Sequence, residues 1–237
     1  MTRFDSTQWS LVLRARGTTP DARTALDNLC RAYRPPVLAY IRGRGYSGDA
    51  AEDLAQTFFT RFLEDAYHAT ADPTRGRFRA FLLTALKRFL INAEAEVRTL
   101  KRGGGARIDR LDNSGLNADQ IASSDTLSPE REFERSWAVT VLNAALRRLR
   151  AEADGAGKGK LFEQLREFLT EPPDEEDYAR VATALNLRRN TLAVAVHRLR
   201  HRLQELVREE LLQTTAARED LDAELRELRA TLAGVVD

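Results

Sequence analysis

The chain has 237 residues, of which 31% are charged and 43% hydrophobic, and its formal net charge is +1. This profile is typical of a soluble globular protein and excludes a long disordered chain. Its single cysteine excludes an intramolecular disulfide and a cysteine-based metal cluster. No stretch has the roughly 20 apolar residues of a membrane span, and the first residues lack the apolar core of a signal peptide. We therefore expect a cytoplasmic protein without a membrane partner.

The charges are unevenly distributed along the chain. Residues 75–107 hold nine Lys or Arg and two Glu, and residues 178–204 hold six Arg and no acid. Residues 205–237 hold nine acids and four Arg. Two separate basic segments in a neutral chain predict two contacts with a polyanion.

The first half of the chain reads as helices at Gln8–Arg16, Asp21–Arg42, Asp49–Ala66 and Arg77–Lys101. We expect the second helix to bend at "RPP", because proline breaks the backbone hydrogen-bond ladder. In the third helix, Leu54, Phe58, Phe59 and Phe62 form an apolar stripe. Its other face begins with Asp49, Glu52 and Asp53 and continues with Gln56, Thr57 and Thr60.

A stretch rich in Gly, Ser, Asn and Asp, residues 101–130, separates this half from a second group of helices. Ser128-Pro129-Glu130 is a helix start signal. The following helices are expected at about 130–153, 158–170, 175–185, 190–212 and 217–233. The sequence predicts an all-α fold with two helical domains and a tether; the alternative is one domain with a long surface loop.

The segment "YARVATALNLRRNTLAVAVHRLRHRL", residues 178–203, has the pattern of a helix-turn-helix. Leu192, Val196, Leu199 and Leu203 form the core stripe of its second helix, and Asn suits the polar turn. The absence of acids favours DNA as the partner of this helix. The alternative is an ordinary helical hairpin with a solvated basic face.

The other basic segment, "RGRFRAFLLTALKRFL", interleaves phenylalanine with Arg and Lys. Aromatic rings beside basic groups can stack on unpaired bases. Most of the rings nevertheless lie on one helical stripe and are expected in the core. The polar face that bears Arg77, Thr84, Arg88 and Asn92 is then the expected contact surface.

Both segments, in this order, resemble the extracytoplasmic-function sigma factors of bacterial RNA polymerase over roughly residues 9–210. "YRPPVLAYIRGRGYSGDAAEDLAQTFF" and "FRAFLLTALKRFLINAEAE" resemble sigma region 2, and the helix-turn-helix resembles region 4. The resemblance implies a region 2-like domain at 1–102, a linker at 103–129, a region 4-like domain at 130–213 and a C-terminal helical extension at 214–237.

The resemblance implies a promoter-specificity subunit for a stress- or signal-dependent gene set. Its partners would be the clamp and flap of the polymerase core, the −35 duplex and the −10 single strand. The implied polymerase-binding residues are Asp49, Glu52, Asp53, Gln56 and Thr57. The implied DNA-binding residues are Arg77, Arg79, Lys87, Arg88 and Asn92 in the first domain and Arg188, Arg189, Asn190, Thr191, His197, Arg198 and Arg202 in the second.

Three departures from the family pattern carry expectations. Ala193, Val194 and Ala195 stand where the family has polar or basic residues, so we expect base readout from the turn residues 188–191 and from DNA shape. The helix that resembles the family's downstream-element helix ends in "INAEAEVR" instead of the common "DxxR". We therefore expect it to recognise different promoter bases. Beyond residue 214, a helix with a leucine stripe is expected to pack on the second domain; the alternative is a regulatory docking role.

Thr57 stands where the family commonly has an acid. Phosphorylation would add about −1.5 to −2 charges beside Asp53. Some members of the family are governed by a Ser/Thr protein kinase, and this chain resembles them. We therefore expect Thr57, and less strongly Thr60, to be a phosphorylation site. The alternative is that the three acids suffice and Thr57 is a neutral surface residue.

Two segments resemble enzyme motifs, but neither has the residues that its motif requires. "GAGKGK", residues 155–160, lacks the first glycine and the hydroxyl of a phosphate-binding loop. His197 and His201 have no third ligand. We expect no catalytic residues, metal or cofactor. The remaining alternative function is a helical DNA-binding repressor or signalling adaptor that does not engage polymerase.

Overall fold

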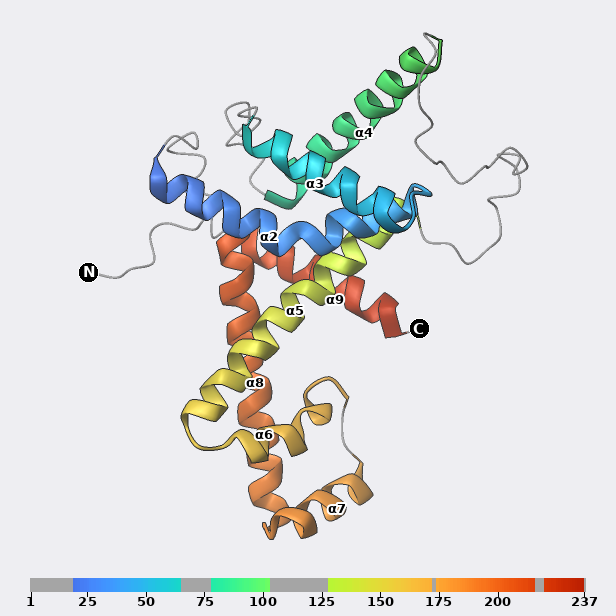
Figure 1. Cartoon of the computed structure of the whole chain (residues 1–237). Helices are drawn as coiled ribbons and strands as arrows, with labels where there is room; N and C mark the ends of the chain where they lie inside the picture. Colours follow the sequence, from blue (N-terminus) through green and yellow to red (C-terminus); the bar gives the residue numbers. More distant parts are fainter. Residues whose placement is uncertain (1–18, 65–77, 103–127, 172–173, 216–219, 237) are drawn as a thin grey trace. The chain divides into compact units, whose positions relative to one another are not determined.

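The computed structural model describes residues 19–64, 78–102, 128–171, 174–215 and 220–236, and every regular element in these ranges is a helix (Figure 1). The chain divides into two compact units. Unit 1 comprises residues 1–140 and 212–237, and unit 2 comprises residues 141–211. The prediction of an all-α fold is confirmed.

Unit 1 contains α2 (Pro20–Gly43), α3 (Gly48–Glu64) and α4 (Phe78–Arg102). The backbone N–H of Ala22 donates to Thr19 Oγ1 at 3.2 Å, which caps α2. One helix continues across Pro35 and Pro36. The predicted helix at residues 8–16 and the linker at 103–127 lie outside the described residues.

Aromatic rings form the core between these helices, as the apolar stripes predict. The rings of Phe58 and Phe89 lie 5.5 Å apart, and those of Phe62 and Phe78 lie 6.4 Å apart. Tyr33 of α2 meets Phe78 edge to face at 5.0 Å. Each ring is buried, so α2, α3 and α4 share one hydrophobic core.

Unit 2 contains most of α5 (Pro129–Gly155), followed by α6 (Gly159–Leu165), the short 3₁₀-helix η4 (Glu167–Leu169) and α7 (Glu175–Leu185). It ends with most of α8 (Arg189–Thr214). Ser128 caps α5 through the N–H of Arg131 at 3.3 Å, as the start signal predicts. Leu165, Phe168, Val181, Leu192 and Val196 form the core of this unit.

The C-terminal helix α9 (Leu221–Val236) belongs to unit 1. Its Glu224 and Glu227 pair with Arg79 at the start of α4. The structure groups this helix with α2, α3 and α4 in unit 1, together with residues 130–140 of the predicted second domain. The leucine stripe was identified correctly, since Leu228 is buried, but a stripe does not specify the surface that it covers.

Candidate functional site

The exposed face of α3 carries most of the residues expected to bind polymerase. Asp49, Asp53, Gln56, Thr57 and Thr60 are all exposed. They follow one another at helical spacing, so they share one side of the helix. We call these five residues the α3 face.

Glu52 does not share this environment. It is half-buried, and its carboxylate accepts from Arg34 at 2.7 Å and from Arg42 at 3.1 Å, both on α2. Two guanidinium groups therefore compensate one carboxylate. The α3 face retains two acids, Asp49 and Asp53, rather than the three that the sequence suggests.

The polar side of α4 carries part of the predicted single-strand contact. Thr84, Arg88 and Asn92 are exposed on it, whereas Arg77 lies outside the described residues. Lys87 is half-buried and pairs with Glu130 of α5 at 2.8 Å. This hydrogen bond lowers the pKa of Glu130.

Arg79 is the clearest correction to the predicted DNA-binding set. Its side chain is 6% exposed and pairs with Glu134 at 2.5 Å, with Glu224 at 3.3 Å and with Glu227. Its guanidinium carbon lies 3.7 Å from the centre of the Trp137 ring. We call these five residues the Arg79 cluster. Because its charge is buried and compensated, Arg79 offers no surface to DNA.

The residues predicted to form a helix-turn-helix lie in two consecutive helices, α7 and α8, which Figure 1 draws in orange. The N–H of Asp177 donates to Asp174 Oδ1 at 2.8 Å and the N–H of Asp174 to Asp177 Oδ2 at 3.4 Å, a capping box that starts α7. Asn186 ends α7 in the left-handed region, with φ 51°. The N–H of Leu187 then donates to the carbonyl of Ala182 at 2.9 Å.

Replacing Asn186 tests this turn. We expect Asn186→Ala to lower the free energy of unfolding of unit 2 by about 1 kcal/mol, because a Cβ without a local hydrogen-bonding group disfavours positive φ. Asn186→Gly is expected to be neutral or stabilising. Hydrogen exchange of the α7 and α8 amides measures the difference. Equal protection in the two variants would contradict the assigned backbone conformation.

The start of α8 presents most of its predicted duplex-binding residues to solvent. Arg188, Asn190, Thr191, His197 and Arg198 are exposed. Arg189 is also exposed, but it pairs with Glu175 of α7 at 2.9 Å. The opposite side of α8 holds the buried Leu192 and Val196, so the helix is anchored on one side and open on the other.

Arg202 is half-buried and lies among acids of unit 2. It donates to Glu152 and Glu205, each at 2.8 Å, and lies 3.4 Å from Glu209. These hydrogen bonds raise the pKa of Arg202 and lower those of Glu152 and Glu205. Three carboxylates of the chain therefore surround a residue that the sequence assigned to DNA binding.

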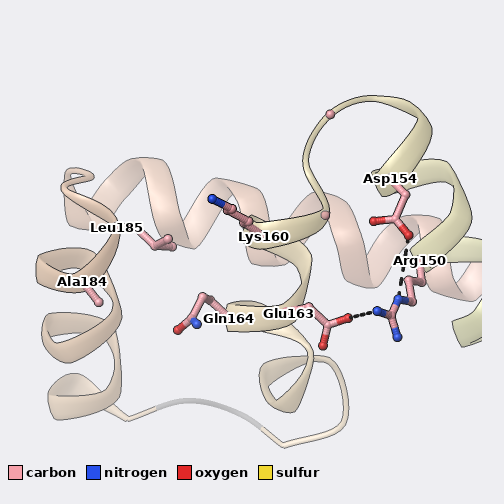
Figure 2. Close-up of a pocket in the computed structure, with 9 residues that line it drawn as sticks. Arg150, Asp154, Lys160, Glu163, Gln164, Ala184 and Leu185 are labelled. Atoms are coloured by element: carbon pink, nitrogen blue, oxygen red, sulfur yellow. Dashed lines mark ion pairs between the residues drawn. The ribbon is translucent and has the colours of Figure 1, made fainter.

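A cavity of about 770 Å³ in unit 2 lies beside the "GAGKGK" segment. Figure 2 shows Arg150 directed at Asp154 and Glu163, with distances of 3.8 and 3.1 Å. Lys160, Gln164, Ala184 and Leu185 also line it. Residues 156–157 form a turn between α5 and α6, as expected for a segment that is not a phosphate-binding loop.

Within the described residues, no three His, Cys, Asp or Glu side chains are placed to hold a metal ion. In the same ranges, no helix is both long and apolar enough to cross a membrane. His201 Nδ1 lies 3.5 Å from the carboxylate of Glu205, one helical turn further along α8. The neighbour of His201 on this helix face is therefore an acid.

Comparison with known proteins gives a family match for part of unit 1. No curated protein and no solved structure matches the chain. Residues 29–102, which run from α2 through α4, match the family Sigma-70 region 2. The chain therefore contains a Sigma-70 region 2 domain, which supports its membership of the sigma factor family.

Proposed function

We propose that the chain is a promoter-specificity subunit of bacterial RNA polymerase of the extracytoplasmic-function type. The observation that carries the proposal is the match of residues 29–102 to Sigma-70 region 2. Further along the chain, the consecutive helices α7 and α8 with the exposed Arg188, Arg189 and Arg198 support it. A sigma subunit carries out no chemical step; it directs polymerase to a promoter and helps to open it. The proposal places the chain in the cytoplasm, where polymerase works.

Three contacts follow from this role. The α3 face meets the polymerase clamp, where charge complementarity sets the docking orientation. Arg88 and Asn92, together with Arg77, hold the displaced strand at the −10 element. The start of α8 enters the major groove of the −35 duplex while unit 2 meets the flap.

We further propose that phosphorylation of Thr57 by a Ser/Thr protein kinase switches the protein on for a signal-dependent gene set. Thr57 is exposed one helical turn after Asp53. Glu52 pairs with Arg34 and Arg42, so the unmodified α3 face carries two acids, Asp49 and Asp53, rather than three. A phosphate adds about −1.5 to −2 charges at this point. Thr60 lies one turn further on and is the weaker candidate.

A transcription assay tests the central proposal. Purified chain, unmodified or carrying phosphothreonine at position 57, is added to core polymerase with fragments of bacterial genomic DNA, and transcript start sites are mapped. We expect starts that depend on the chain and share −35 and −10 sequences. DNA binding without any effect on polymerase, in either modification state, would instead favour a repressor or adaptor.

A further inference from the structure

We infer that Val194 reads a thymine in the −35 duplex through the C5-methyl group of that base. The inference rests on the proposed function, because it requires α8 to enter the major groove. It adds a specificity-determining residue that the expected readout from residues 188–191 does not include.

The position of Val194 on α8 supports this role. Leu192 and Val196 are buried in the core of unit 2, and Ala195 packs against it. On a helix, the residues that point away from this anchored side are Asn190, Val194, His197 and His201. All four are exposed, and we call them the recognition face.

Val194 is the only apolar member of the recognition face. It is 49% exposed, although valine is a residue type that is most often buried. It lies less than two turns from the start of α8 at Arg189, and the first turns of a recognition helix are the part that contacts base edges. Polar side chains surround it on this face, so it is an isolated apolar contact rather than part of an apolar docking patch.

The chemistry of the major groove selects the base. Among the four bases, thymine alone presents a methyl group there, whereas the others present only hydrogen-bond donors and acceptors. A valine side chain cannot form hydrogen bonds, but it can bury that methyl group. Removing one methyl group from water contributes about 0.8 kcal/mol, which corresponds to roughly a fourfold change in affinity.

The test uses duplexes that differ by single methyl groups. Binding sites are first selected from a randomised duplex library with polymerase holoenzyme formed with the full chain carrying phosphothreonine at position 57. Each thymine of the −35 region is then replaced by deoxyuridine, which pairs identically but lacks the methyl group. We expect one replacement to weaken binding by roughly fourfold for the wild type and to have no effect for Val194→Ala. Placing 5-methylcytosine in a matched cytosine duplex is expected to restore part of the affinity only when Val194 is present.

A control variant separates this effect from general changes in surface hydrophobicity. Val139 on α5 is a comparable valine, 39% exposed and outside the recognition face. Val139→Ala is expected to keep the wild-type response to deoxyuridine. Because both valines are exposed, neither alanine variant is expected to disturb folding.

The outcomes distinguish the inference from the proposed function. Deoxyuridine effects that are absent, or equal in the wild type and Val194→Ala, would overturn the inference while leaving the sigma role intact. Failure of the holoenzyme to select any duplex sequence would overturn both. A methyl effect that disappears only with Val194→Ala supports both.

Discussion

Arg79→Ala is expected to lower the free energy of unfolding of unit 1 by about 3–5 kcal/mol. The change removes a cation that pairs with Glu224, whose side chain is 2% exposed, and leaves that carboxylate buried without this cation. Breaking a buried ion pair from one side costs far more than the pair contributes, because the remaining charge loses a cation while it stays removed from water.

Fluorescence of Trp137 measures this effect in the unit where it arises. The sequence has two tryptophans, so a Trp9→Phe background assigns the signal to Trp137. The two units can unfold in separate transitions. Urea unfolding followed by the fluorescence of Trp137 reports the transition of unit 1 alone. Arg88→Ala, on the exposed side of the same helix, is the matched control and is expected to change stability by less than about 0.5 kcal/mol.

A double variant tests the physical cause. Arg79→Met with Glu224→Gln removes the buried charge together with its partner, and we expect it to recover much of the lost stability. If the double variant does not recover stability, the loss of stability in Arg79→Ala comes from lost packing against Trp137 rather than from a buried charge. Full stability of Arg79→Ala would contradict the buried cluster itself.

Phosphothreonine at position 57 is expected to raise chain-dependent transcription roughly tenfold over the unmodified protein, which corresponds to about 1.4 kcal/mol of clamp affinity. Unmodified protein presents Asp49 and Asp53 as the exposed acids of the α3 face, since Glu52 is paired with two arginines. Thr57→Glu adds a single charge and is expected to give a smaller increase. Transcription from a selected promoter at fixed polymerase concentration measures each form.

The neighbouring hydroxyl provides the control for position. Phosphothreonine at position 60 lies beyond the acids on the same face and is expected to give a weaker increase. Thr57→Ala should behave like unmodified wild type and should not respond to kinase. Full transcription by both unmodified wild type and Thr57→Ala would refute the switch and leave Thr57 a neutral surface residue.

Local patterns in the sequence predicted the helices well. The predicted helix at 175–185 coincides with α7, and the stripe containing Phe58 and Phe62 lies in the core. Hydrophobic period, caps and turn residues act over a few positions, so they can be read without knowledge of the fold. The same holds for Asn186, whose left-handed conformation follows from the needs of a short polar turn.

Charge partners could not be predicted in this way. Arg79 has the sequence context of a DNA contact, yet one of its carboxylates, Glu224, is 145 positions away. Glu52 and Arg202 were similarly assigned to partners outside the chain, although acids and bases of the chain already surround them. A charged residue gives no local signal of whether water, another molecule or a distant helix will compensate it.

The Arg79 cluster also orders the events of synthesis. Arg79 leaves the ribosome 145 positions before Glu224, an interval of roughly 7–30 s at about 5–20 residues per second. During that time α2, α3 and α4 can form their aromatic core and Arg79 can pair with Glu134, but its pairs with Glu224 and Glu227 require α9. The Arg79 cluster of a nascent chain is therefore incomplete until α9 has been synthesised.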